Sequence, residues 1–347
     1  MNRKITFLTI ILIVGQLITN AQAYDNTFRI MFYNVENLFD TEDDPNTRDE
    51  EFTPKGMRAW TDYKLKKKIS NIYKVIAAVG EGSTLDMVGF CEIENRAVLE
   101  MITDNTPLKH HGYEIIHKDS KDRRGIDVGL IYRKDRYWPI EEKFITTSFR
   151  NDPSKVSRDI LYSKGILPNK DTLHIFVNHW PSKYGGAMAT RTMREDVALT
   201  LRAFTDSIFA SNPNANIVIS GDLNTGPLDE PVKETLGAAV FPDTANSNLI
   251  NLTTAIYPSK YPGTIKFQGV WECIDIWILS KAMLNDPNSL TQCSPEQAFI
   301  GEFDFLLEED KTYLGLIPFR TYIGMSFNDG YSDHLPTYIH LTLYDKP

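Results

Sequence analysis

Carboxylate, carboxamide and imidazole side chains recur in this sequence at the ends of short apolar runs. Asp222 and Asn224 follow the run Ile217–Ser220 in the tetrapeptide Gly-Asp-Leu-Asn, and Asp333 and His334 stand just before the last apolar run. Hydrolysis of a phosphate ester needs such groups: oxygen ligands for a hard cation, a base that activates water, and a group that stabilises or protonates the leaving oxygen. The residue types therefore predict a site for this chemistry.

Four further segments have the same character. Asn34 and Glu36 follow the first apolar run, Glu92 ends the second, and His179 ends another before a Gly-rich turn. Asp275 lies inside an apolar run, where a carboxylate without a donor or cation would be costly. Each segment alone has a simpler explanation, because Asn often ends a strand and a lone histidine is more often structural. The whole set in this order is harder to explain in that way.

In this order the segments resemble the endonuclease/exonuclease/phosphatase superfamily, which includes deoxyribonuclease I, apurinic endonucleases, bacterial sphingomyelinases and inositol polyphosphate 5-phosphatases. The matching motifs are N-V-E-N, C-E-I-E, N-H-x-x-S, G-D-L-N, I-D and S-D-H, and they extend from Asn34 to His334. The resemblance implies an α/β fold, a four-layer sandwich in which two mostly antiparallel sheets pack face to face with helices outside.

The resemblance also implies a metal site. Glu92 is expected to be the main carboxylate ligand of a catalytic divalent cation, with Asn34 as a second ligand and Asp333 beside the metal. Glu36 stands where relatives have a shorter acidic residue, and we assign it to the same site. Ligation by oxygen alone favours Mg²⁺, or else Mn²⁺ or Ca²⁺, over zinc.

Five residues are expected to carry the catalysis. Asp222 would position or deprotonate the attacking water, and Asn224 would hold a phosphoryl oxygen. His334 would contact the phosphate and pair with Asp275, which would offset the burial of that carboxylate and set the tautomer of the imidazole. His179 would stabilise or protonate the leaving oxygen. The general base is Asp222 or His334, and the sequence leaves both open.

Three further residues are predicted to contact the substrate or to orient the groups that do. Arg124 and Asp127 lie in the charged segment Asp119–Tyr132, where an arginine could meet phosphate and Asp127 could orient His179. The alternative is that these charged residues only form the turn of a hairpin. Asn178 precedes His179 in the element N-H-W-P-S-K.

Short apolar runs of β-branched and aromatic residues predict the strands that must position these groups. Apolar residues at helical spacing predict helices over Asp62–Val79 and Thr190–Ala210. Strands on both sides of scattered helices favour two packed sheets with helices outside. The predicted strands are Phe28–Tyr33, Met87–Cys91, Val128–Tyr132, Leu173–Val177, Ile217–Ser220, Ile274–Leu279 and Tyr338–Leu343.

Polar segments between these elements are predicted to be loops. The acidic stretch Asp40–Glu51 is interpreted as a solvated loop and not as a calcium site, because its carboxylates lack the defined ligand spacing of a calcium loop. Asn285–Pro295 and Gly324–Tyr331 are the other two.

The first 23 residues have the parts of a secretory signal peptide. Arg3 and Lys4 precede the apolar run Ile5–Val14, and the tripeptide Ala21-Gln22-Ala23 ends the segment. The run is short for a membrane span, which needs about 20 apolar residues. Cleavage after Ala23 would leave residues 24–347 as a single domain, exported to the periplasm or beyond the cell.

The net charge of −9 does not suit a protein that binds polyanions tightly, although a hydrolase that releases its product remains compatible with it. The three cysteines, Cys91, Cys273 and Cys293, are too few for a disulfide scaffold. Cys91 and Cys273 lie in apolar runs and are predicted to be buried free thiols.

The substrate class follows from finer resemblances. The elements N-H-W-P-S-K-x-G-G and N-V-E-N-L-F-D make the chain similar to endonuclease-like proteins exported by Gram-negative bacteria. We expect DNA or RNA as the substrate, low specificity, and a monomer without a stable protein partner. A lipid-headgroup phosphodiesterase or phosphoinositide phosphatase is the alternative. Exposed aromatic residues would then contact the membrane, and the candidates are Trp60, Trp180, Tyr184 and Trp271.

A third interpretation is a binding module that has kept this fold and lost its activity. Such a module would show broken motifs, whereas every acidic, amide and imidazole position that the resemblance leads us to expect is filled.

Overall fold

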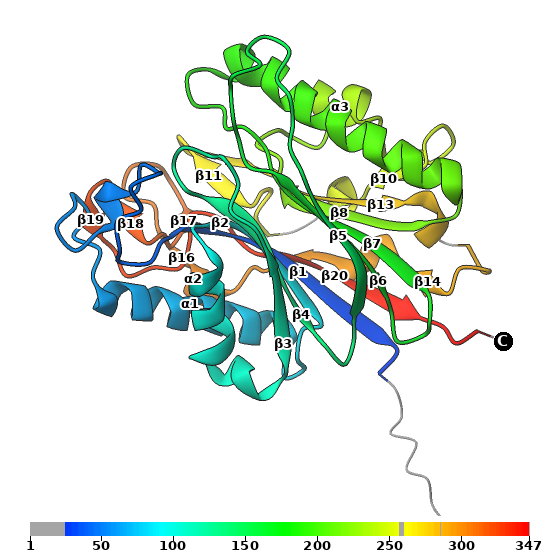
Figure 1. The fold of residues 1–347 in the computed structure, drawn as a ribbon, viewed down its shortest axis with the longest axis horizontal. Helices are drawn as coiled ribbons and strands as arrows, with labels where there is room; N and C mark the ends of the chain where they lie inside the picture. Colours follow the sequence, from blue (N-terminus) through cyan, green and yellow to red (C-terminus); the bar gives the residue numbers. More distant parts are fainter. Residues whose placement is uncertain (1–24, 257–259, 285, 347) are drawn as a thin grey trace, which may run out of the picture.

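Two seven-stranded sheets lie face to face at the centre of the structure (Figure 1). The structure is a computed structural model that describes residues 25–256, 260–284 and 286–346, so the predicted signal peptide lies outside the described residues. Most neighbouring strands are antiparallel; the exceptions are the parallel pairs β1–β2, β7–β8 and β9–β10. The first sheet has the order β14 (Thr291–Gln292), β20 (Thr337–Leu343), β1 (Thr27–Leu38), β2 (Met87–Ile93), β4 (Asp127–Arg133), β3 (Tyr113–His117), with β15 (Ala298–Ile300) paired to β20. The second has the order β5 (Trp138–Ile145), β6 (Ile160–Ile166), β7 (Thr172–His179), β8 (Asn216–Asp222), β13 (Asp275–Ser280), β10 (Leu249–Asn251), β9 (Ala239–Val240).

Helices cover the outer faces of both sheets. Helices α1 (Asp62–Gly80) and α2 (Arg96–Asp104) pack on the first sheet, and the long helix α3 (Ala187–Ser211) packs on the second (Figure 1). The predicted four-layer sandwich is therefore confirmed. Three small hairpins complete the chain: β11 (Ile265–Phe267) with β12 (Val270–Glu272), β16 (Leu307–Glu309) with β17 (Leu316–Pro318), and β18 (Tyr322–Ile323) with β19 (Ser326–Phe327).

Strand β8 shows why its sequence is a continuous apolar run. Val218 points into the core between the two sheets, whereas Ile217 and Ile219 point to the opposite face, where Val197 and Leu201 of α3 cover them. Successive side chains of a strand point to opposite faces, so a strand that is covered on both sides needs apolar residues at every position. The active-site residue that follows such a strand is held on a rigid support.

The predicted strands all overlap strands of the structure, and both predicted helices are present. Helix α1 ends one residue later than predicted, and α3 begins at Ala187, three residues before the predicted start. Helix α2, strands β3, β5 and β6, and the short strands β9–β12 and β14–β19 were not predicted. Strand β5 lies at a sheet edge and alternates partly exposed with exposed residues, among them Glu141, Glu142 and Lys143. Charged residues protect edge strands from pairing with other chains. In β5 they also break the apolar pattern by which a strand is predicted from the sequence.

The predicted loops need small corrections. Gly324–Tyr331 contains the two-residue strand β19, and Asn285–Pro295 contains β14, with Asn285 itself outside the described residues. Asp40–Glu51 is mainly exposed as predicted, but Asp49 within it is buried.

All three cysteines are buried, as the sequence suggested for Cys91 and Cys273. Within the described part of the chain, no helix is both long enough and apolar enough to span a membrane.

Candidate active site

Strand pairing gathers the predicted residues at one edge of the two sheets. In the first sheet, β1 and β2 run parallel and pair Asn34 with Cys91. In the second sheet, β7 and β8 run parallel and pair His179 with Asp222, and β13 places Asp275 opposite the same Asp222. The carboxyl ends of parallel strands meet at the same edge of a sheet, where open α/β sheets commonly bind ligands. Residues far apart in the sequence therefore converge there.

Asp222 is the centre of this group. Its Oδ2 accepts a hydrogen bond from Nδ2 of Asn34 at 3.1 Å, and its Oδ1 accepts one from the backbone N–H of Asn224 at 2.9 Å. Oδ2 also lies 3.7 Å from Nε2 of His179 and 3.8 Å from Nε2 of His334. Burial raises the pKa of Asp222 to about 7, although the charge of His334 acts to lower it. One carboxylate oxygen thus faces two imidazoles at distances that suit a bridging atom better than a direct hydrogen bond.

His334 is held by Asp275. Its Nδ1 lies 2.7 Å from Oδ2 of Asp275, and the hydroxyl of Thr264 donates to that same oxygen. Burial alone would lower the pKa of His334, but the charges of Asp275 and Asp222 outweigh it and raise the pKa well above its ordinary value. The imidazole is therefore a cation at neutral pH, and it compensates the buried charge of Asp275. The pairing expected from the resemblance is present.

The imidazole of His179 is neutral, in contrast to that of His334. Its Nε2 lies 3.7 Å from Asp222 and 3.9 Å from Oε1 of Glu92. Burial, together with the positive charges of Arg158 and Arg124, lowers the pKa of His179 well below its ordinary value. A neutral imidazole and an imidazolium therefore stand on either side of the Asp222 carboxylate.

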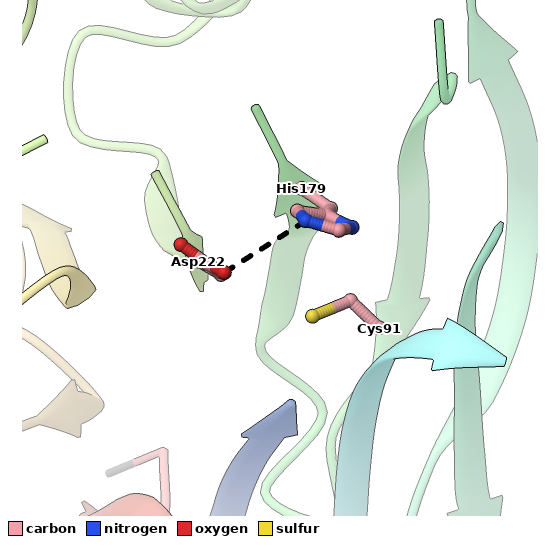
Figure 2. A group of neighbouring side chains, drawn as sticks. All are labelled: Cys91, His179 and Asp222. Atoms are coloured by element: carbon pink, nitrogen blue, oxygen red, sulfur yellow. Dashed lines mark ion pairs between the residues drawn. The ribbon is translucent and has the colours of Figure 1, made fainter. Parts of the chain in front are cut away.

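Cys91 lies beside His179 and Asp222, as Figure 2 shows. Burial and the neighbouring negative charge of Asp222 raise the pKa of its thiol well above the ordinary value. The thiol is therefore a neutral, buried group beside His179 and Asp222. The sequence indicated the burial of Cys91 but not this position.

Four non-glycine residues at this edge have left-handed backbone conformations. Their φ angles are 50° for Glu36, 57° for Asn37, 61° for Glu92 and 50° for Asn224. Such conformations cost of order 1–3 kcal/mol each and are concentrated at functional sites. Here they turn the chain at the ends of β1, β2 and β8, just where the polar side chains must leave the sheets.

Steric contact with the neighbouring strand explains why the G-D-L-N motif begins with glycine. A Cβ on Gly221 would lie 2.3 Å from the carbonyl oxygen of Asn178 on the neighbouring strand β7. No side chain fits there, so the close approach of β7 and β8 requires glycine. That approach sets the distance between His179 and Asp222.

Glu92 is the best placed of the predicted metal ligands. Its Oε2 accepts a hydrogen bond from the backbone N–H of Asn37 at 3.0 Å, while Oε1 faces His179. Oδ1 of Asn34 accepts one bond from the backbone N–H of Glu36 and has a second lone pair. Carboxylate and carboxamide oxygens suit Mg²⁺, Mn²⁺ or Ca²⁺, so these donors fit the expected cation.

The carboxylate of Glu36 contacts the segment that carries Arg320, and its ligation of the metal stays a prediction. Its Oε1 accepts from Nε of Arg320 at 3.3 Å and its Oε2 accepts from the backbone N–H of Thr321 at 2.6 Å. Arg320 also pairs with Asp333 through Nη2 at 2.9 Å. Burial and the nearby Asp333 raise the pKa of Glu36, and the ammonium of buried Lys68 opposes that rise. Glu36 therefore anchors the segment that carries Arg320, and Arg320 is a cation of the site that no sequence motif marks.

Two side chains converge on the backbone carbonyl of Trp180, next to His179. Nδ2 of Asn224 donates to it at 3.0 Å, and Nη2 of Arg158 donates to it at 2.7 Å. The amide of Asn224 has a second N–H for the predicted phosphoryl oxygen. Arg158 is also paired with Asp122 at 3.1 Å. The sequence gives no sign of Arg158 as a site residue, and only the fold brings it there.

Asp127 does not orient His179, contrary to the prediction. Its Oδ1 accepts from the backbone N–H of Ser120 at 3.0 Å, and its Oδ2 lies 3.8 Å from Nε2 of His117. Burial raises the pKa of Asp127 to about 7. Arg124 of the same segment is half exposed, and its charge acts on His179, so it lies near the site as expected.

Asn178 is fully buried and cannot reach a substrate, which corrects a second assignment. Its Nδ2 donates to the carbonyl of Ser220 at 3.2 Å, and its Oδ1 accepts from the indole N–H of Trp180 at 3.2 Å. The side chain joins the ends of β7 and β8 and thereby supports His179.

A two-sheet sandwich with acids and imidazoles at one edge is an arrangement suited to the hydrolysis of phosphoric esters. The chain belongs to the endonuclease/exonuclease/phosphatase family, whose model matches residues 29–343. Members of this family are phosphoric ester hydrolases that generally use divalent metal ions. No protein with a curated description matches the chain by sequence.

Solved structures support the same fold. TDP2 from D. rerio in complex with a single-strand DNA product is similar with a TM-score of 0.56 and 16% identity, over 91% of this chain and 99% of that one. A mannosyl-6-phosphatase from Bacteroides thetaiotaomicron has a TM-score of 0.55 and 15% identity, over 90% and 99% of the two chains. The human Nocturnin catalytic domain with bound sulfate has a TM-score of 0.54 and 13% identity, over 92% and 95%. At such identities the likeness concerns the fold alone.

Proposed function

We propose that this chain is an exported, metal-dependent phosphodiesterase that hydrolyses DNA or RNA with low specificity. One observation carries the proposal: a buried carboxylate, Asp222, lies between a neutral and a charged imidazole, within 3.7 Å of His179 and 3.8 Å of His334. A base, a cation for the phosphoryl oxygens and a group near the leaving oxygen are the parts that ester hydrolysis needs.

Asp222 is the better candidate for the general base. Its pKa of about 7 allows it to accept a proton from water near neutral pH. His334 already carries its proton, because Asp275 raises its pKa, so it is suited to stabilise negative charge on a phosphoryl oxygen. His179 is left to hold the leaving oxygen. Glu92 and Asn34 would hold the divalent cation, which when bound neutralises charge on the phosphate.

Several features favour a nucleic-acid substrate. Arg124 and Arg158, whose charges act on His179, and Arg320, which pairs with Glu36 and Asp333, are cations at the site of a chain that is acidic overall. The similar TDP2 structure holds a single-strand DNA product. A net charge of −9 predicts that binding is weak, as suits an enzyme that must release its product. The chain would act as a monomer without a stable protein partner.

Export is part of the same proposal. The basic start, apolar run and Ala21-Gln22-Ala23 support cleavage after Ala23, which would leave a mature chain, residues 24–347, as one domain in the periplasm or outside the cell. Mass spectrometry of the protein recovered from periplasm and medium, with Tyr24 as the expected first residue, tests it. A protein that still begins with Met1 would contradict export through this signal.

A lipid-headgroup substrate is the second candidate, and exposed apolar hairpin turns favour it. Phe267 and Val270 at the turn of β11 and β12 are 60% and 62% exposed, and Leu314 at the turn of β16 and β17 is 96% exposed. The first of these hairpins is next to the site, since Ile265 forms a β-bridge with His334. Exposed apolar groups of this kind can mark contact with membranes.

The predicted aromatic anchors do not strengthen this candidate. Trp60 and Trp180 are fully buried, which excludes them from membrane contact, and Trp271 packs against Tyr261. Tyr184, 93% exposed, is the aromatic residue of the predicted four that could insert.

Hydrolysis by the purified mature chain tests the proposal. The substrates are plasmid DNA, RNA, sphingomyelin, a soluble phosphoinositide and mannose 6-phosphate, with Mg²⁺ or Mn²⁺ and with a His334→Ala control. Degradation of nucleic acid that the control lacks would support the nuclease. Turnover of a lipid headgroup or a phosphomonoester alone would refute it and keep the site. No hydrolysis of any substrate would favour an inactive binding module.

A further inference from the structure

His117, the last residue of β3, faces two carboxylates outside the catalytic group. Its Nε2 lies 3.8 Å from Oδ2 of Asp127 at the start of β4, and its Nδ1 lies 3.9 Å from Oδ1 of Asp119 in the loop between these strands. One ring nitrogen and one oxygen from each aspartate lie within 4.8 Å of one another. These separations are too long for hydrogen bonds, and they exceed the distance of about 3.3 Å between ligands of a tetrahedral metal ion by an amount that a side-chain rotation can close.

The imidazole has an unsatisfied nitrogen. The side chain of His117 is only 2% exposed, and among the residues that the structure describes none makes a hydrogen bond to Nε2. A buried polar atom without a partner costs about 1–3 kcal/mol, so native structures rarely keep one without a reason. A cation bound to Nε2 would supply the missing partner.

Asp127 is already oriented for such an ion. The backbone N–H of Ser120 donates to its Oδ1 at 3.0 Å, which holds the carboxylate in place and leaves Oδ2 toward His117. Hydrogen bonds of this kind commonly fix metal ligands. Asp119 has an 80% exposed side chain and can turn toward the same point without disturbing the core.

The surroundings attract cations. Asp119 and Asp127 line a cavity of about 540 Å³ whose wall contains eight acidic residues and two basic ones, Lys121 and Arg123. Burial raises the pKa of Asp127 to about 7 and that of Glu94 to about 8, but the other six carboxylates still outnumber the two basic residues, and such negative charge in a concave surface raises the local concentration of cations. It supports a cation as the ligand but does not by itself choose the ion.

We propose that His117, Asp119 and Asp127 form a second metal site, separate from the catalytic one, that binds Zn²⁺ with water completing the coordination. The imidazole decides the class of ion. Zn²⁺ accepts nitrogen and oxygen ligands together, whereas Mg²⁺ and Ca²⁺ prefer oxygen alone. The proposal goes beyond the proposed hydrolase function and does not depend on it.

The ion would close the base of the loop between β3 and β4. That loop carries Asp122, which pairs with Arg158, and Arg158 in turn donates to the carbonyl of Trp180 beside His179. A metal bound at His117 would therefore hold the support of Arg158 in place without taking part in the chemistry.

Zinc binding to the purified mature chain tests the proposal. The metal-stripped protein is dialysed against Zn²⁺ with Mg²⁺ in excess, and bound zinc is counted by mass spectrometry and titrated by calorimetry. The variants are His117→Ala, Asp119→Asn and the matched control His110→Ala, which removes an exposed histidine from the same region. Circular dichroism shows whether each variant is folded.

The wild type and His110→Ala should hold one zinc ion more than His117→Ala. Asp119→Asn changes an exposed side chain and should fold normally while its zinc affinity falls about tenfold or more. Zn²⁺ should also raise the melting temperature of the wild type more than that of Asp119→Asn. Equal zinc content in the wild type and both site variants would overturn the proposal. Preferential binding of Ca²⁺ at these residues would overturn the choice of ion.

Discussion

Asp275→Asn is the substitution that most directly tests the charge arrangement of the site. Asp275 is fully buried, and its Oδ2 receives both Nδ1 of His334 and the hydroxyl of Thr264. Asparagine has nearly the same shape, and its amide oxygen can accept the same hydrogen bonds. The substitution therefore removes a charge and leaves the packing intact. The imidazole of His334 should become neutral near pH 7.

The expected loss of activity is estimated from the ion-pair distance and from the usual cost of losing one transition-state contact. At the observed separation of 2.7 Å and an effective dielectric constant of about 20, the Coulomb attraction is about 6 kcal/mol. Burial of both groups offsets part of this attraction. Loss of one preorganised electrostatic contact to a transition-state oxyanion costs about 2.7–4 kcal/mol, or about 10²–10³-fold in kcat. We expect kcat to fall by that factor and KM to change little.

Two measurements check this prediction. Steady-state hydrolysis of a soluble chromogenic phosphodiester gives kcat and KM, and NMR titration of the histidine ring signals gives the pKa of His334. In the wild type that pKa should lie well above 6.5, the ordinary value, and in Asp275→Asn it should fall. Asp304→Asn serves as the control, because its side chain is 94% exposed.

The reasoning would be refuted if folded Asp275→Asn kept more than about a tenth of the wild-type kcat, since the expected loss is about 10²–10³-fold. An unchanged pKa of His334 in the variant would show that Asp275 does not set its charge. A loss of activity with no change in that pKa would point to a positional and not an electrostatic role.

Four further predictions concern pH, metal and packing. The rate of hydrolysis should rise with pH through about 7 as Asp222 loses its proton, and Asp222→Asn should lower kcat by about 10²–10⁴ and flatten the pH–rate profile. Burial raises the pKa of Glu94 from 4.5 to about 8, so the folded state favours its protonated carboxyl. This contribution to the free energy of unfolding is complete below pH 4.5 and is lost as pH rises through about 8. Thermal melting should therefore show Glu94→Gln close to the wild type at pH 5 and more stable than it by roughly 2–5 kcal/mol at pH 8.5. Arg320→Ala removes the cation between two carboxylates and should lower stability by about 1–3 kcal/mol without metal and less with Mg²⁺, as melting curves will show. Gly221→Ala should cost roughly 2–3 kcal/mol in urea unfolding, because its Cβ meets the carbonyl oxygen of Asn178; unchanged unfolding would contradict the close strand approach.

The sequence by itself determined the buried central strands, two of the three α-helices among the described residues and the polar residues that follow those strands. Ile217–Ser220 is apolar at nearly every position because β8 is covered by the first sheet on one face and by α3 on the other. Such a run marks a buried strand in the sequence alone, so the polar residues that follow it, Asp222 among them, must lie at a strand end. The order of the motifs then indicated the family and its sandwich fold.

Partners across the fold were not readable from the sequence. Nothing in the spacing joins Arg320 to Glu36, yet the two side chains form an ion pair at 3.3 Å. Asn178 precedes His179 in the N-H motif and was predicted to contact the substrate. Its side-chain amide instead hydrogen-bonds to Ser220 and Trp180 at the ends of β7 and β8. Asp127 was expected to orient His179, but its carboxylate accepts from the backbone N–H of Ser120 and faces His117.

Local sequence sets which residues can end a strand, because propensity and alternation act between near neighbours in the chain. The register of β7, β8 and β13 decides which ends meet, and it brings His179 and Asp275 to the same carboxylate, Asp222. Burial then decides the charges: it keeps His179 neutral, while the buried Asp275 makes His334 a cation. Two histidines that look alike in the sequence thus differ in charge, one neutral and one positive, because a pKa depends on neighbours that only the tertiary structure supplies.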